Sequence, residues 1–267
     1  MNANVASIGN LLRSWRELRH LSQLDLALEA EISQKHLSFL ESGRSTPSRE
    51  MILHLSKHLD VPLRERNAML LAAGFAPAFK DRPLSDPALA QARASIERLL
   101  KAHEPYPALT LDRQWNILSA NRAVWSLLGA VDSQLLKPPV NVLRISLHPS
   151  GLAPHIVNFG EWRSHLLERA KRQWRLTRDP ALEALLKEVS DYKIDGHELD
   201  SGASASPNEI AIPLRLRVPG GTLSFLSTVT VFGTALEISL AELTLETFYP
   251  ADAETASALL AQTTSER

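Results

Sequence analysis

The sequence predicts two domains, an all-α domain of five short helices followed by an α+β domain with an antiparallel sheet. Capped apolar stripes at helical spacing follow one another through residues 8–74. A proline-marked stretch at 75–87 then interrupts this pattern. Further on, residues 210–232 carry β-branched and alternating apolar side chains on either side of a Pro-Gly-Gly turn, which indicates a β-hairpin.

Helix caps delimit the five short helices of the first domain. Ser22 and Ser33 are of the residue type whose side chain accepts a hydrogen bond from the first turn of a helix. Gly43 suits the position after a helix, where the backbone becomes left-handed. The expected helices cover residues 8–18, 22–30, 33–41, 47–59 and 63–73.

A linker and a connecting helix follow. Pro77, Pro83 and Pro87 mark the linker, and Asp86 with Pro87 is a good helix start. The connecting helix is predicted from one apolar face, formed by Leu89, Ala92, Ile96, Leu99 and Leu100. The expected organisation is therefore a first domain at 1–80, a linker and connecting helix at 81–105, and a second domain at 106–267.

The second domain mixes strands and helices, the pattern of an α+β fold. Strands are expected at 108–112, 116–120, 210–218, 222–232 and 242–248. Helices are expected after the cap Asn121, at 158–175, at 180–190 and after Asp252. The segment 138–154 is marked by prolines, and we assign it no element.

Composition limits the classes of protein. Of the 267 residues, 44% are hydrophobic and 22% are charged, which excludes a disordered or fibrous chain. The absence of cysteine excludes disulfide scaffolds, thiolate zinc sites and cysteine nucleophiles, and no metal site is expected. No apolar run is long enough to cross a bilayer, and the N-terminus lacks the layout of a signal peptide. We expect a cytoplasmic protein without a membrane partner.

The formal net charge of -1 hides an uneven distribution: residues 1–80 carry +2, residues 81–180 carry +5 and residues 181–267 carry -8. A basic part of a chain can face an anionic partner, but this charge alone neither supports nor excludes nucleic acid. The basic run at 169–175 is interpreted as a solvated helix face rather than a second DNA surface.

One segment of the first domain, SQLDLALEAEISQKHLSFLESGRSTPS at residues 22–48, combines two caps, a short turn and a glycine stop. It resembles the XRE-type helix-turn-helix family, which has the fold of phage repressors. The matching residues include Ala27 where the two helices cross and Ile32 in the turn. The resemblance implies a five-helix, lambda-repressor-like domain that binds double-stranded DNA with its third helix in the major groove.

The resemblance also implies DNA contacts. It places Gln23 on a phosphate and Arg44 on the DNA backbone, and it pairs Arg16 with Glu41 beneath the recognition helix. Gln34 could pair with adenine, Lys35 could reach guanine or a phosphate, and Phe39 could pack on a thymine methyl group. The complete expected contact set is Gln23, Ser33, Gln34, Lys35, Ser38, Phe39 and Arg44. The alternative is that these polar residues are merely solvated.

Most of the chain beyond the linker resembles the MmyB-like ligand-binding domain, a PAS-like sensor joined to this type of helix-turn-helix. The most specific piece runs from Gly221 through Phe232-Gly233-Thr234 to Tyr249-Pro250-Ala251-Asp252. The resemblance implies a small-molecule pocket between sheet and helices, which in some members holds a fatty acid. We expect no other cofactor.

Candidate pocket residues are apolar side chains of the expected strands and helices, together with cations for a carboxylate head. The apolar set is Leu109, Leu111, Ile117, Trp125, Leu128, Trp162, Leu166, Phe225 and Val229. The head-group candidates are Arg122, Arg144 and His148. The alternative for each is an ordinary core or turn residue.

These observations favour a dimeric, ligand-responsive transcription regulator, in which two copies read adjacent half-sites of an operator. The competing hypothesis is a constitutive DNA-binding protein whose second domain serves only dimerisation. An enzyme is a third, weaker alternative. No catalytic residue is predicted, because the sequence contains no G-x-S-x-G, G-x-x-x-x-G-K-[ST], H-E-x-x-H or G-x-G-x-x-G motif.

Overall fold

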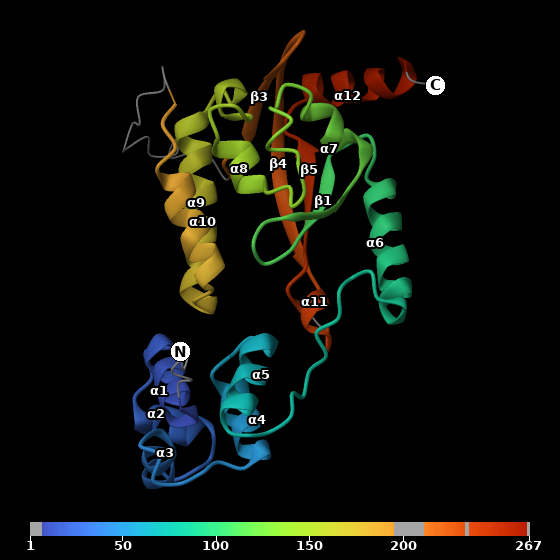
Figure 1. Cartoon of the computed structure of the whole chain (residues 1–267). Coiled ribbons are helices and arrows are strands. Elements are labelled where there is room, and N and C mark those ends of the chain that lie inside the picture. Colours follow the sequence, from blue (N-terminus) through green and yellow to red (C-terminus); the bar gives the residue numbers. More distant parts are fainter. Residues whose placement is uncertain (1–6, 195–210, 233–234, 266–267) are drawn as a thin grey trace. The chain divides into compact units, whose positions relative to one another are not determined.

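The protein is described here from a computed structural model, which covers residues 7–194, 211–232 and 235–265 (Figure 1). Contacts divide the chain into two compact units. The first unit comprises Met1–Pro83 together with Thr234–Ala241, and the second comprises Leu84–Gly233 together with Glu242–Arg267. A short piece of chain that lies late in the sequence therefore belongs to the N-terminal unit.

Between residues 7 and 83 the first unit folds into five helices, as predicted. Ser22, Ser33 and Ser48 each accept a hydrogen bond from a backbone N–H of the helix that they precede, and Ser22 forms a capping box with Asp25. The apolar stripes meet in one core. The helices are α1 (Ile8–Leu18), α2 (Gln23–Glu29), α3 (Gln34–Glu41), α4 (Arg49–His58) and α5 (Leu63–Ala72).

A further, very short helix of this unit is α11 (Ile238–Ala241), for which the sequence predicted no element. The backbone N–H of Ile238 donates to the carbonyl oxygen of Lys80 at 2.9 Å, and the side chain of Ile238 is only 1% exposed. The Ser239 hydroxyl donates to the carbonyl oxygen of Arg82, whose guanidinium lies 3.7 Å from the Glu237 carboxylate. These contacts hold the segment against the chain that follows α5.

The second unit is built on one antiparallel sheet, which has five strands among the residues described. Its order is β2-β1-β5-β4-β3, and every neighbouring pair is antiparallel. The strand expected at 210–218 begins only at Leu214, and Ile210 lies outside the described residues. The strands are β1 (Ala108–Leu111), β2 (Ile117–Ala120), β3 (Leu214–Val218), β4 (Gly221–Val231) and β5 (Thr244–Pro250).

Helices flank this sheet. Figure 1 shows α8, α9 and α10 on one side of the strands and α6 on the other. Leu99 is 51% exposed, so the predicted apolar face of the connecting helix was wrong at this position. The prolines of segment 138–154 concealed α8. The helices are α6 (Ala90–Ala102), α7 (Arg122–Leu127), α8 (Val142–Leu147), α9 (Phe159–Thr177), α10 (Pro180–Ser190) and α12 (Ala253–Ser265), with 3₁₀ turns η1 (Pro87–Leu89) and η2 (Ala153–His155).

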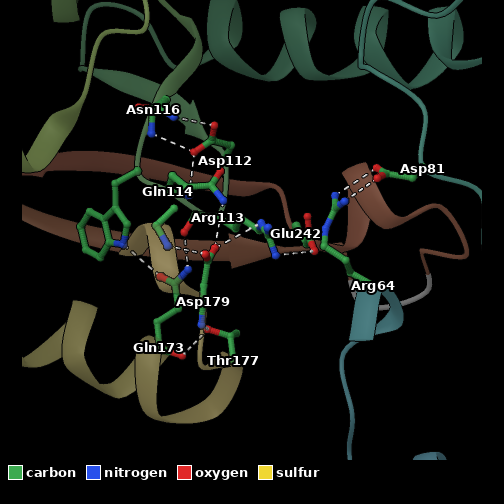
Figure 2. A network of polar contacts seen from close by, with 12 residues as sticks. Arg64, Asp81, Asp112, Arg113, Gln114, Asn116, Gln173, Thr177, Asp179 and Glu242 are labelled. Atoms are coloured by element: carbon green, nitrogen blue, oxygen red, sulfur yellow. Dashed lines mark hydrogen bonds and ion pairs between the residues drawn. The ribbon is translucent and has the colours of Figure 1, made fainter. Parts of the chain in front are cut away.

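A polar network fixes the β1–β2 turn to the start of α10. Asp179 caps that helix by accepting from the backbone N–H of Ala181 at 2.9 Å. Its second carboxylate oxygen accepts from Gln114 Nε2 at 2.9 Å and lies 3.3 Å from Arg113 Nε. The Arg113 guanidinium also lies 3.9 Å from Glu242 (Figure 2). The buried Asp179 carboxylate is thus paired and hydrogen-bonded, as a buried charge must be.

Candidate nucleic-acid interface and apolar cavity

Helices α2 and α3 are joined by a tight turn. The turn needs one residue in the left-handed region, Glu31 with a φ of 51°. The Ile32 N–H then donates to the carbonyl oxygen of Ala27 at 2.9 Å, which closes the end of α2. Ala27 is buried, and its small side chain allows the two helices to cross closely. The connection therefore sets the angle at which α3 is presented.

A buried ion pair locks the inner face of α3 onto α1. Arg16 Nε donates to Glu41 Oε1 at 2.6 Å, and Arg16 Nη2 donates to Glu41 Oε2 at 2.9 Å. The remaining guanidinium nitrogen, Nη1, donates to the carbonyl oxygen of Leu21 at 2.8 Å. The Glu41 side chain has no exposed surface. This bidentate pair is the one that the helix-turn-helix resemblance implied.

The electrostatics keep this pair charged. Burial by itself raises the pKa of the Glu41 carboxyl, but hydrogen bonds from Arg16 and Gln23 and the charges of Arg16 and Arg13 outweigh burial. The net result is a pKa below the usual glutamate value. The hydrogen bond to Glu41 in turn raises the pKa of Arg16. Glu41 is therefore an anion at neutral pH.

Gln23 takes part in this inner cluster. Its Nε2 donates to Glu41 Oε2 at 2.8 Å, and the residue is half-buried at the start of α2. The amide donor predicted to meet a phosphate is thus held by a carboxylate in the DNA-free chain. The side chain lies at the expected helix end. Its amide nitrogen carries a second N–H, which can donate to a phosphate while the first stays on Glu41.

The outer face of α3 presents the other predicted contact residues. Gln34 and Lys35 are exposed in its first turn, behind the N-cap Ser33. Phe39 is half-buried, with Lys35 Nζ 5.6 Å and Arg44 Cζ 5.8 Å from its ring centroid. Ser38 lies on the same half-buried flank. The structure brings these side chains to one surface, where two cations border an aromatic ring.

Gly9 is a residue that sequence reasoning missed. A Cβ atom added to it would lie 2.6 Å from the carbonyl oxygens of both Leu40 and Glu41. Glycine thus lets the first turn of α1 approach the backbone at the end of α3. The one sequence signal for this contact is a single glycine inside an amphipathic helix. Such a glycine is compatible with close packing against another backbone.

An apolar cavity of about 70 Å³ lies in the second unit, between the sheet and α7, α8 and α9. Ser146 and Glu246 are the polar exceptions in its wall. Its lining residues are Pro107, Leu109, Ile117, Val124, Leu127, Leu128, Val142, Ile145, Ser146, Leu152, Trp162, Leu166, Leu214, Leu216, Phe225, Glu246 and Phe248. The wall thus draws on all five strands and three helices, residues far apart in the sequence.

The structure brings together part of the predicted apolar set. Leu111 is buried in the same core but does not line the cavity, whereas Trp125 and Val229 are exposed. Trp125 lies on the outer side of α7, and Val229 lies four residues beyond Phe225 along β4. The predicted residues that do line the cavity are Leu109, Ile117, Leu128, Trp162, Leu166 and Phe225.

The three head-group candidates lie elsewhere. Arg144 donates to both carboxylate oxygens of Glu188 at 2.7 Å, and this bond raises the pKa of Arg144 and lowers that of Glu188. The His148 ring stacks edge-on against Tyr192, with 4.9 Å between the centroids. Arg122 begins α7. None of these three side chains is part of the cavity wall.

The charged pair at the cavity is instead Glu246 with Arg169. Arg169 Nη1 donates to Glu246 Oε1 at 2.8 Å, and the Arg169 guanidinium lies 4.6 Å from the centroid of the Trp115 ring. This arginine belongs to the run that was interpreted as a solvated helix face, so that interpretation was wrong for Arg169. The two partners are 77 residues apart, and no local pattern joins them.

Comparison with known families identifies both parts. Residues 92–261 match the family described as the MmyB-like transcription regulator ligand binding domain. The chain belongs to this family. Residues 12–66 match the helix-turn-helix family, as the first-domain motif indicated. A search of curated proteins finds no match to the chain.

The matches agree with the architecture of this MmyB-like regulator. The helix-turn-helix match begins in α1, contains α2, α3 and α4, and ends in α5. The ligand-binding match begins in α6, contains the sheet and ends in α12. Within the part of the chain that the structure describes, no helix combines the length and apolarity that a bilayer crossing requires. The two family matches together indicate a DNA-binding transcription regulator with a ligand-binding domain.

Proposed function

We propose that this MmyB-like regulator binds an operator as a homodimer and responds to an apolar effector in its second domain. The observation that carries the DNA half is the outer face of α3. Its base-reading candidates Gln34 and Lys35 are exposed, while Arg16 and Glu41 hold the opposite face in place. A recognition helix needs both features, an accessible polar edge and a rigid support.

The roles of the contact residues follow from their chemistry. A glutamine can pair bidentately with adenine in the major groove, and a lysine can reach guanine acceptors or a phosphate. Arg44 follows α3 and is exposed, a suitable place for a backbone contact. Phe39 keeps its aromatic edge at the same surface, where it can meet a thymine methyl group. The proposal places the protein in the cytoplasm with its operator.

Dimerisation is part of the proposal because the first domain carries only +2. Phosphate contacts by Lys and Arg supply much of the affinity of DNA-binding proteins. Two copies on half-sites about 34–36 Å apart would double these contacts and select a near-palindromic operator. No catalytic role is proposed, since both matched families are regulatory or ligand-binding.

The DNA half is tested with operator DNA selected from a random pool. Gln34→Ala is expected to cost about 1–3 kcal/mol on the selected operator and to relax the preference at one base pair. Arg44→Ala is expected to weaken all sequences alike and to reduce the salt dependence of binding. Lys101→Ala, on an exposed position of α6, is the control and should bind as wild type. If Gln34→Ala kept the wild-type operator affinity and base-pair preference, Gln34 would not be a major-groove contact.

For the effector we propose an apolar molecule with an acyl chain, a class that includes fatty acids and their neutral derivatives. The nearly wholly apolar wall supports this class. The volume of about 70 Å³ is below that of an engineered cavity of about 150 Å³ that binds benzene, so the cavity must widen before it can hold an acyl chain. The PAS-like architecture is also proposed, supported by the strand order and by the α-helices α7, α8, α9 and α10 between β2 and β3.

The small volume also favours the second candidate function, a constitutive regulator whose second domain only dimerises. Organic extraction of the purified full-length protein, followed by mass spectrometry, separates the two. A stoichiometric lipid in the extract is expected for the effector proposal. A protein that carries no small molecule and gains no thermal stability with any acyl compound would support the dimerisation function instead.

A further inference from the structure

Trp162 contains a buried hydrogen-bond donor without an acceptor. The residue lies on α9, lines the cavity and is 3% exposed. Among the described residues, its indole Nε1 is the only buried side-chain donor that lacks a partner. Trp115 behaves differently, since its Nε1 donates to Gln173 Oε1 at 3.0 Å. A buried unpaired N–H lowers stability, and such groups are rare in folded proteins.

No neighbouring residue that the structure describes accepts a hydrogen bond from Trp162 Nε1. His165 stacks on the indole ring with 5.4 Å between centroids and an interplanar angle of 29°, so it contacts the face of the ring and not its N–H edge. The charged residue of the cavity wall is Glu246, whose Oε1 already accepts from Arg169. The polar groups of the wall are thus the unpaired Trp162 N–H, the Ser146 hydroxyl and a carboxylate whose counter-ion is already in place.

We propose that the effector carries a neutral oxygen, a hydroxyl or a carbonyl group, which accepts a hydrogen bond from Trp162 Nε1. This inference rests on the proposed ligand cavity and specifies the polar end of its ligand. A plain hydrocarbon would leave the N–H unpaired. An ammonium group has no lone pair to offer the indole.

A free carboxylate suits the cavity less well than a neutral group. Within so small a space a second anion would lie near Glu246, in surroundings of low dielectric constant where like charges repel strongly. Arg169, which is not part of the wall, is already paired with Glu246, and no cation among the described residues belongs to the wall. The favoured ligands are therefore long-chain alcohols, aldehydes, ketones or esters, in preference to the ionised fatty acid.

Three probes of equal chain length test this inference on the full-length protein: hexane, 1-hexanol and hexanoate at pH 7. The variant is Trp162→Phe, which keeps an aromatic ring and removes the donor. It is expected to weaken 1-hexanol binding about tenfold, since the ligand oxygen is then buried without a partner. Hexane binding should change less than about twofold, because hexane makes no hydrogen bond. Trp174→Phe, outside the cavity wall, is the matched control and should alter neither.

A second readout needs only the wild-type fold. The indole N–H resonance of Trp162, assigned by its loss in Trp162→Phe, is expected to shift downfield with 1-hexanol and not with hexane. Equal weakening of both ligands by Trp162→Phe, an unmoved indole resonance, or tighter binding of hexanoate than of 1-hexanol overturns the inference and leaves the cavity proposal standing. If neither hexane nor 1-hexanol binds the wild-type protein, the proposed cavity function falls, and the inference with it.

Discussion

At the scale of single residues, Gly9 shows how the lack of a side chain on α1 lets the recognition-helix candidate α3 pack closely against it. The carbonyl oxygens of Leu40 and Glu41 occupy the space where a Cβ atom would be. Because these are backbone atoms near the end of α3, they cannot rotate away as a flexible side chain could. Any larger residue at position 9 must push α1 and α3 apart, and α3 carries the proposed base contacts.

Gly9→Ala is therefore expected to destabilise the first unit by about 1–3 kcal/mol, in the range of overpacked sites, and to weaken operator binding. Trp15, the single tryptophan of that unit, reports its unfolding through the ¹⁹F signal of fluorotryptophan-labelled protein. The control is Gly160→Ala in α9, where a new Cβ meets nothing within 4 Å, and where the better helix former should be neutral or stabilising. Equal effects of the two substitutions would contradict the close-approach argument.

Glu41 makes the stability of the first unit depend on pH. Its pKa is lowered in the folded chain, so its contribution is complete above the unfolded-state value of about 4.3 and is lost as pH falls through the lower folded value. We expect Glu41→Gln to cost about 3 kcal/mol at pH 7, since the largely buried Arg16 then keeps only the exposed Glu17 as a counter-charge. The variant should also show a flatter stability profile below pH 5.

Denaturant unfolding followed by the Trp15 signal between pH 3 and 7 measures both effects. Glu17→Gln is the matched control, because Glu17 lies 3.8 Å from the same arginine but is mostly exposed, and a surface pair contributes little. If wild type and Glu41→Gln lost stability in parallel as the pH fell, Glu41 would not be the group responsible.

At the scale of elements, α11 belongs to the first unit although the strands on either side of it in the sequence belong to the second. Ile238 is its buried anchor, and Leu236 in the same segment is 80% exposed. Ile238→Ala is expected to destabilise the first unit by about 2–4 kcal/mol, the cost of truncating a buried Ile. Hydrogen exchange of the α5 amides in the full-length protein measures this.

Leu236→Ala provides the comparison and is expected to leave exchange in α5 unchanged. Two variants with the same exchange rates would show that α11 contributes no stability to the helical unit. The residues between β4 and β5 would then be a simple connection.

Much of the fold was predictable because its elements carry local signals. Ser22, Ser33 and Ser48 start helices by their own side-chain chemistry, and the β3–β4 hairpin follows from its turn. Helices α8 and α11 were not predicted, because they are short and tertiary contacts hold them. The exposed Leu99 shows the limit of periodicity, since an apolar residue at the edge of a stripe can face solvent.

The candidate sites divide in the same way. The proposed DNA-contact residues lie within one continuous segment, so the motif that they form can be recognised from the sequence. The ion pair of Arg169 and Glu246 cannot be recognised from the sequence, because the two residues come from a helix and a strand that only the fold brings together. The unpaired Trp162 N–H is likewise a property of packing and has no sequence signal.

At the scale of the whole molecule, the proposed regulator is a dimer in which each copy has a DNA-binding unit and a ligand-binding unit. An effector can regulate such a dimer only by binding more tightly to one arrangement of the two DNA-binding units than to another. The difference in affinity sets the size of the response, and typical couplings are about 1–3 kcal/mol. The effector should therefore change operator affinity about 5- to 150-fold, and the operator should change effector affinity by the same factor.

The proposed regulation is tested by the operator affinity of the full-length protein, measured by fluorescence anisotropy at fixed salt. The cavity is first emptied by extraction and then reloaded with the extracted effector. If the effector regulates DNA binding, the two affinities differ at least about fivefold, and Gln34→Ala weakens both. Identical operator affinity in the empty and loaded states would contradict it.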